Sequence, residues 1–186
     1  MSGRPRDPEL EKRLLAATWR LLVEQGYAEL TLSRVATEAE AHRTDVYRRW
    51  SSKSELVSDT LAEHLPSFMA RDTGSLSSDL AAFIDEVALI WSSAWIDGLI
   101  GWLADIRHDP GAEASRTMLE NRRRPVLAML DRAVRRGEID EVVDPAVLGD
   151  LLEGPLMHRR LYRGLDLTPE FLDTVTQSVY RYLTTT

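Results

Sequence analysis

Residues 31–53, TLSRVATEAEAHRTDVYRRWSSK, decide the fold. A threonine is followed by apolar residues at helical spacing, a pattern that predicts a short helix capped by the threonine hydroxyl. The residues of this pattern are Thr31, Leu32, Val35, Ala36 and Ala39. A turn then leads into a second short helix over about 42–50. Two short helices joined by a tight turn indicate a helix-turn-helix motif.

The second of these helices has one inward side and one exposed side. Val46 and Trp50 are four residues apart and can pack inward together. The exposed side or its edges then carry two arginines, a threonine, an aspartate and a tyrosine, at Arg43, Thr44, Asp45, Tyr47 and Arg48. Such a helix suits the major groove of DNA, because arginine can bridge two acceptors on guanine. Taken alone, a short basic helix is also typical of a merely solvated surface.

The charge of the chain is unevenly distributed. The net charge is −7, but residues 1–56 hold ten Lys and Arg against nine Asp and Glu. The remaining residues hold 13 basic and 21 acidic side chains. A locally basic head on an acidic body is compatible with binding to nucleic acid.

Helix signals continue on both sides of the motif. Asp7-Pro8 predicts the start of a first helix and Gly26 its end in a left-handed conformation. Ser52 and Glu55 form a capping box that opens a fourth helix. Further on, the spacing predicts a helix over 76–95 and a shorter one over 98–107, with Gly98 and Gly101 breaking helical continuity. A helix over about 110–136 would follow, kinked at Pro125. Two more helices would begin at Asp144-Pro145 and Thr168-Pro169.

The whole pattern predicts an all-α protein with about nine helices. A three-helix helix-turn-helix domain over 1–56 would bind DNA, and a larger helical domain would span 57–186. No alternating strand pattern flanked by turns stands out.

Residues 14–56 resemble the N-terminal domain of the TetR family of bacterial regulators. The matching stretches are LLAATWRLLVEQGY (14–27), TLSRVATEA (31–39) and VYRRW followed by SSKSEL (46–56). The family's glycine-aromatic pair at the end of the first helix is Gly26-Tyr27 here. The chain departs from the family at Glu40, where a glycine is frequent in the turn, so the turn must avoid or tolerate a left-handed residue. Trp50 replaces the usual phenylalanine.

The resemblance implies roles for eight residues. Four would contact phosphates, namely Thr31, Tyr47, Arg49 and Lys53. Four would face base edges, namely Arg43, Thr44, Asp45 and Arg48. Asp45 would repel phosphates unless it accepts a hydrogen bond from cytosine or pairs with Arg43 or Arg48.

Two later segments also resemble the C-terminal domain of this family, RAVRRGEID (132–140) and DLLEGPLMHRRLYRG (150–164). The resemblance implies that helices of about 145–163 and 169–184 form a four-helix bundle with a second copy. Both helices carry apolar stripes at helical spacing, which fit such a homodimer. From the residues alone, packing of both stripes within one chain is favoured over a dimer by about two to one. The resemblance therefore assigns ligand binding and dimerisation to the domain over 57–186.

A cluster of large side chains is a candidate ligand site, at Trp91, Trp95, Trp102 and Met118. Trp91 and Trp95 are four residues apart and would share one helix face. On composition alone such a set is more often plain core, by about three to one, and the family resemblance brings the two readings nearer to even. A cavity lined in this way would favour a hydrophobic or aromatic small molecule. Asp97 and Asp105 could pair with a cationic group or serve as caps.

Several other classes of protein are not indicated. The chain has no cysteine, and its four histidines are scattered without metal-ligand spacing, so neither a metal nor a cofactor is expected. No catalytic motif is present, and we expect no enzyme. Residues 87–104 contain an aspartate and two serines, which favours two short buried helices over a membrane span. The N-terminus lacks a secretory pattern, so a cytoplasmic location is expected.

The leading hypothesis is a ligand-responsive repressor that binds a palindromic double-stranded operator as a homodimer. Two recognition helices about 34 Å apart would read the half-sites, and an effector would shift the dimer to another spacing. One alternative is a helical carrier or enzyme that keeps the helix-turn-helix as scaffold. Another is a ligand-independent nucleoid-type binder.

Overall fold

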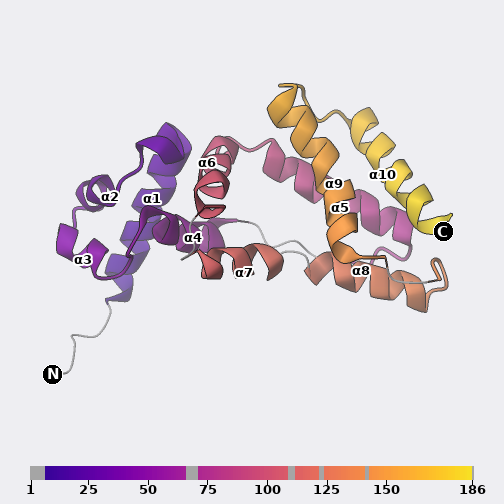
Figure 1. The fold of residues 1–186 in the computed structure, drawn as a ribbon, viewed down its shortest axis with the longest axis horizontal. Helices are drawn as coiled ribbons and strands as arrows, with labels where there is room; N and C mark the ends of the chain where they lie inside the picture. The colour runs from indigo at the N-terminus through magenta and orange to yellow at the C-terminus, as the bar shows by residue number, and fades with distance from the viewer. Residues whose placement is uncertain (1–6, 66–70, 109–111, 122–123, 141–142, 186) are drawn as a thin grey trace. The chain divides into compact units, whose positions relative to one another are not determined.

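The computed structural model describes residues 7–65, 71–108, 112–121, 124–140 and 143–185, without the side chains of Ala114, Met118 and Glu120. These residues form ten α-helices and one π-helix and no strand (Figure 1), which confirms the prediction of an all-α fold. The helices are α1 (Pro8–Glu29), α2 (Leu32–Glu38), α3 (Arg43–Tyr47), α4 (Lys53–His64), α5 (Leu76–Trp91), α6 (Ile96–Ile106), α7 (Glu113–Asn121), α8 (Arg124–Arg135), α9 (Pro145–Met157), η1 (His158–Tyr162) and α10 (Pro169–Thr184).

The chain divides into two compact units, which are described separately. The first combines residues 1–66 with 94–118 and holds α1 to α4 and α6. The second combines residues 67–93 with 119–186 and holds α5, α8, α9, η1 and α10. The two units are defined by packing alone. The predicted division at residue 56 between a DNA-binding domain and a C-terminal domain therefore stays a prediction.

Three helices of the first unit, α1, α2 and α4, begin at the predicted caps. The Asp7 carboxylate accepts hydrogen bonds from two backbone N–H groups in the first turn of α1. The Thr31 hydroxyl accepts from the Arg34 N–H at 3.2 Å, and the Ser52 hydroxyl from the Glu55 N–H at 3.1 Å. Each bond satisfies a backbone donor that has no partner inside its own helix.

Two residues in the first unit adopt positive φ angles where the chain turns. Gly26 has a positive φ of +78°, as expected, but its ψ of 172° is extended, and it kinks α1, which continues to Glu29. Glu40 has a φ of +51° between α2 and α3, so this turn tolerates a left-handed residue without glycine. The turn is closed by the Ala41 N–H, which donates to the Ala36 carbonyl at 2.8 Å.

Helix α6 packs closely on α1 through two glycines. A Cβ atom added at Gly98 would lie 2.7 Å from Leu22 Cγ, and one added at Gly101 would lie 2.7 Å from Tyr27 Cβ. The expectation that these glycines interrupt the helix is wrong, because both lie inside α6. They are tolerated there because only a glycine leaves room for α1 at this distance.

The predicted helix over 76–95 ends early, at Trp91. The Ser93 hydroxyl donates to the Leu89 carbonyl at 2.6 Å, and a serine that bonds the backbone in this way competes with continuation of the helix. Trp91 and Trp95 therefore do not share a helix face. No single described helix is long and apolar enough to cross a membrane, and α5 and α6 reach that length and composition only when counted together across their break.

The core of the second unit is built around α5, which contacts α8, α9 and α10. Its fully buried side chains include Leu80, Ile84, Leu130, Leu148 and Leu152. The single kinked helix expected over 110–136 is instead two helices, α7 and α8. The N-terminal caps of α9 and α10 are those predicted, Asp144 and Thr168.

A buried aspartate ties α5 to α8 in the second unit. The Asp79 side chain is 1% exposed, and its Oδ2 atom lies 3.3 Å from Arg132 Nη2 and 3.1 Å from Arg136 Nη2. Thr73 donates to Asp79 Oδ1 from its hydroxyl at 2.6 Å and from its backbone N–H at 2.7 Å. Burial by itself would raise the pKa of Asp79, but these hydrogen bonds together hold it below its ordinary value.

Candidate nucleic-acid interface

Two buried apolar side chains hold the inward side of helix α3 against the rest of its unit. Val46 is fully buried, and Trp50 is buried and donates from Nε1 to Asp59 Oδ2 at 2.8 Å. This confirms the inward side that the sequence predicts. The opposite side is open to solvent, and its exposed residues are Arg43, Thr44, Tyr47 and Arg48.

Asp45 organises two of the arginines near α3. Its Oδ1 atom accepts from Arg48 Nη2 at 2.7 Å, which is one of the two pairings expected for this carboxylate. Its backbone carbonyl accepts from Arg49 Nη1 at 3.0 Å. The Arg49 side chain is only 5% exposed, and its Nε atom lies 4.0 Å from Glu11 Oε2 of α1. Arg48 is thus presented to solvent, whereas Arg49 is held against the body of the unit.

The two hydroxyl-bearing residues predicted to touch phosphates are both exposed. Thr31 already accepts a hydrogen bond as the cap of α2, and its own hydroxyl proton can still be donated. Tyr47 lies 3.4 Å from the Ser33 hydroxyl, measured between the two side-chain oxygens. Ser33 was not predicted from the sequence, because a serine inside a short helix carries no local signal of this contact.

Lys53 lies at the first position of α4 and is half-buried. Its ammonium donates to the Tyr27 carbonyl at 3.1 Å and lies 4.0 Å from the centre of the Tyr27 ring. The Tyr27 hydroxyl in turn donates to Asp105 Oδ2 on α6. Sequence reasoning missed the contacts of Tyr27 with Lys53 and with Asp105, because these partners stand 26 and 78 positions after the tyrosine.

The candidate ligand residues do not form one described site. Trp102 is fully buried and donates from Nε1 to the Ser54 carbonyl at 3.0 Å, and Trp95 lies beside Trp19 with ring centres 5.8 Å apart. Trp91 belongs to the other unit, and the side chain of Met118 lies outside the described residues. Within the described ranges, no three His, Asp or Glu side chains gather as a metal ion would require.

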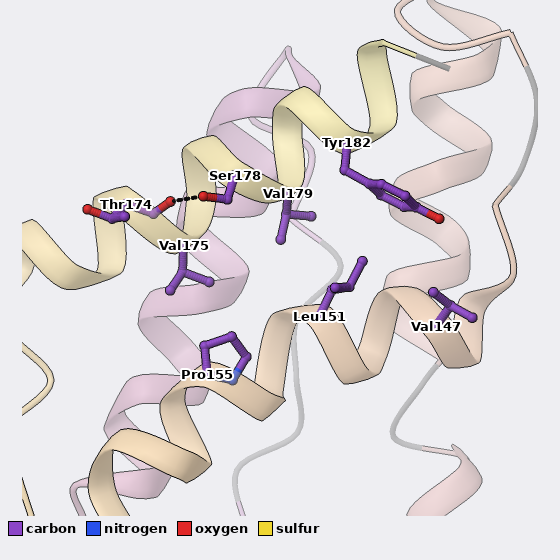
Figure 2. Close-up of a pocket in the computed structure, with 8 residues that line it drawn as sticks. All are labelled: Val147, Leu151, Pro155, Thr174, Val175, Ser178, Val179 and Tyr182. Atoms are coloured by element: carbon purple, nitrogen blue, oxygen red, sulfur yellow. Dashed lines mark hydrogen bonds between the residues drawn. The ribbon is translucent and has the colours of Figure 1, made fainter. Parts of the chain in front are cut away.

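An apolar groove of about 460 Å³ lies between α9 and α10 (Figure 2). Helix α9 contributes Val147, Leu151 and Pro155, and α10 contributes a facing row. That row is Thr174, Val175, Ser178, Val179 and Tyr182. The apolar stripe predicted on the first of these helices is therefore split, with Leu148, Leu152 and Leu156 buried in the chain and Val147, Leu151 and Leu161 partly exposed.

Two family models match the chain. The model described as "Bacterial regulatory proteins, tetR family" matches residues 14–60. The model described as "Tetracyclin repressor-like, C-terminal domain" matches residues 70–179. The two matches together cover the helix-turn-helix and most of the second unit.

Individual proteins resemble the chain over most of its length. It is 29% identical over 187 residues to "Uncharacterized HTH-type transcriptional regulator YdeS" of Bacillus subtilis, covering 96% of this chain and 92% of the relative. It is 32% identical over 155 residues to "DNA-binding transcriptional repressor TetR" of Mycobacteroides abscessus, covering 81% and 82%.

Solved structures share the fold. The TetR family transcription regulator SCO0332 superposes with a TM-score of 0.71 and 27% identity, covering 92% of this chain and 97% of that one. The regulator FadR from Bacillus subtilis, solved in complex with stearoyl-CoA, superposes with a TM-score of 0.66 and 15% identity, covering 93% and 97%.

Proposed function

The chain belongs to the TetR family of bacterial transcriptional regulators, and we propose that it represses transcription as a homodimer on a palindromic operator until a small apolar effector releases it. The observation that carries the proposal is the exposed side of α3. Arg43, Thr44, Tyr47 and Arg48 stand open to solvent on a helix whose other side is fixed by Val46 and Trp50. A helix held in this way can enter the major groove as a rigid element.

The roles of the eight candidate residues follow from their surroundings. Arg48 reaches base edges with its orientation set by Asp45, and Arg43 and Thr44 read neighbouring positions. Thr31, Tyr47 and Lys53 hold phosphates from either side of the helix. Arg49 is assigned to phosphate only by family resemblance, and its burial fits a supporting position between α3 and α1.

Dimerisation places two copies of α3 on one operator. The groove between α9 and α10 supports an interface there, because an exposed apolar surface of this kind is costly in water. A second copy with the same groove turned by a two-fold axis would cover it, as symmetric dimers require. The two recognition helices would then lie about one turn of DNA apart, roughly 34 Å.

The proposed effector is an apolar small molecule. A protein of the same fold, FadR, was solved in complex with stearoyl-CoA, a molecule with a long apolar acyl chain, which supports an apolar ligand for this fold. Among the candidate tryptophans, Trp95 is the one with a partly exposed side chain. We therefore assign contact with the effector to Trp95 and not to Trp102, because Trp102 is fully buried. A difference of about 1–3 kcal/mol in affinity between two states would suffice for a response.

Selection of bound DNA from a random pool by the purified protein tests this function. We expect the recovered sequences to share two inverted half-sites whose centres lie about 10 base pairs apart, or a multiple of that. The control is the double variant Arg43→Ala with Arg48→Ala, which should recover no shared sequence. Retention of DNA without a shared sequence would favour a nucleoid-type binder, and no retention would favour a carrier, so either result would overturn the proposal.

A further inference from the structure

Helix α6 holds the start of α4 through two separate contacts. The first is the hydrogen bond from Trp102 Nε1 to the Ser54 carbonyl at 3.0 Å, between two buried residues. Ser54 is the second residue of α4 and follows Lys53 directly. The position of the lysine backbone is therefore tied to α6.

The second contact runs through Tyr27 to the lysine ammonium itself. Tyr27 is 6% exposed, and its hydroxyl donates to the Asp105 carboxylate of α6. Its ring lies under the Lys53 ammonium at 4.0 Å, and its carbonyl accepts from that ammonium at 3.1 Å. Gly101 allows α6 to approach this tyrosine within contact distance of its Cβ atom. Asp105, Tyr27 and Lys53 thus form one chain of contacts.

We propose that Asp105 and Tyr27 are positioning residues for the phosphate contact of Lys53, an inference that rests on the proposed function. A lysine has a long flexible side chain, and ordering it on DNA costs conformational entropy. Here the ammonium is already held by the ring and carbonyl of Tyr27, and Asp105 fixes the ring from its far end. An ammonium has three N–H donors, so a lysine held by one carbonyl can still donate to a phosphate.

This arrangement assigns α6 a specific effect on DNA binding. The contacts from α6 reach the phosphate-binding lysine. The base-facing side of α3 takes no part in this series of contacts. A change at Asp105 should therefore alter affinity for all DNA sequences alike. Base preference, which depends on Arg43, Thr44 and Arg48, should stay the same.

The sharpest comparison is between two aspartates of α6. Removing a carboxylate from a DNA-binding unit should by charge alone raise affinity for DNA, and we expect this for Asp97→Ala, since Asp97 is exposed. Asp105→Ala makes the same change in charge but loses the tyrosine contact, so affinity should fall about three- to tenfold. Asp105→Asn keeps an acceptor oxygen while losing the charge, so it should bind DNA at least as well as the wild type.

A double-mutant cycle separates positioning from general stability. Lys53→Ala should weaken binding to operator and scrambled DNA alike, and Tyr27→Phe should do so by about three- to tenfold. The double variant should be no weaker than Lys53→Ala alone, because Tyr27 acts through the lysine. Anisotropy titrations at several salt concentrations would measure both the affinities and the salt slopes, and circular dichroism would verify that each variant is folded.

Three results would overturn the inference while leaving DNA recognition intact. The first is a gain in DNA affinity for Asp105→Ala equal to that for Asp97→Ala. The second is a loss of affinity in the double variant equal to the separate losses for Tyr27→Phe and Lys53→Ala added together. The third is unchanged DNA affinity for Lys53→Ala. Failure of the wild-type protein to bind any selected DNA would instead defeat the proposed function itself.

Discussion

At the scale of single residues, the basic side chains near α3 are held in three different ways. Arg48 is bound by the Asp45 carboxylate but remains 65% exposed, and Arg49 is 5% exposed. Lys53 lies over Tyr27 and is half-buried. A charged side chain that is both oriented and exposed suits base recognition, whereas one near the start of a helix suits phosphate.

We expect Arg48→Ala and Lys53→Ala to weaken DNA binding in different ways. Arg48→Ala should cost about 1–3 kcal/mol on the selected operator and little on scrambled DNA, because it removes a base contact. Lys53→Ala should weaken both and lower the slope of log affinity against log salt by about 0.9 for each lysine lost. Titrations of both DNAs in a salt series measure this. Equal effects of the two variants on both DNAs would contradict the division of roles.

The buried Asp79 leads to a prediction about acid stability. Its pKa is held below the ordinary value of 3.8, so the unfolded chain takes up the proton more readily than the folded one. Its contribution to stability is therefore complete above about pH 5 and is lost as the pH falls through the lower folded-state pKa. Asp79→Asn should lower the free energy of unfolding at pH 7 by about 2–3 kcal/mol, since two arginines lose their shared carboxylate.

Urea unfolding at several pH values would measure this effect. The variant should lose less stability than the wild type between pH 5 and pH 3, where its amide does not titrate. A matched control is Asp85→Asn on the same helix, because Asp85 is exposed and should tolerate the change. Parallel acid profiles for the wild type and Asp79→Asn would argue against this role for Asp79.

At the scale of whole helices, the packing of α6 on α1 depends on glycine. A methyl group at Gly101 would lie 2.7 Å from Tyr27 Cβ, which is closer than carbon atoms approach, so the helices would have to separate. The same change at Gly149 in α9 meets nothing within 4 Å. The two positions differ in their surroundings, although both lie inside α-helices.

Gly101→Ala is expected to lower the free energy of unfolding by about 1–2 kcal/mol, because the cost of overpacking exceeds the gain in helix propensity. Gly149→Ala should instead raise it by about 0.5–1 kcal/mol, through helix propensity alone. Thermal unfolding followed by circular dichroism compares the two variants. A stabilising effect of alanine at both positions would show that α6 has room to move away from α1.

At the scale of the whole molecule, assembly depends on the groove between α9 and α10. Charged substitutions that test the interface should be placed at partly exposed positions of the groove. Leu148 and Leu152 are unsuitable for this test, because both are fully buried within the chain. Leu151→Glu with Tyr182→Glu should leave the fold intact but convert a dimer to monomers, because unpaired charge is costly in an apolar interface. Light scattering at micromolar concentration measures the molar mass.

The control for this experiment is Leu89→Glu. Leu89 is 70% exposed on α5 and lies outside the groove, so this variant should remain dimeric. The monomeric double variant should also lose tight operator binding, since each half-site alone contributes only part of the affinity. A wild-type protein that is monomeric at this concentration would refute the dimer.

The sequence by itself determined the local features of this protein. The caps at Asp7, Thr31 and Ser52 bond to N–H groups two or three residues later, so their effect needs only the chain nearby. The inward side of α3, with Val46 and Trp50, follows from helical spacing in the same way. The family resemblance rested on these same stretches.

Only the tertiary structure decided which partner each face meets. Leu148 and Leu151 lie in one apolar stripe, yet the first is buried in the chain and the second lines the groove, because the helices packed on α9 cover only part of the stripe. The contact of Tyr27 with Asp105 likewise joins residues far apart in sequence. Helical periodicity specifies that a side is apolar or polar, and long-range packing then selects its neighbour.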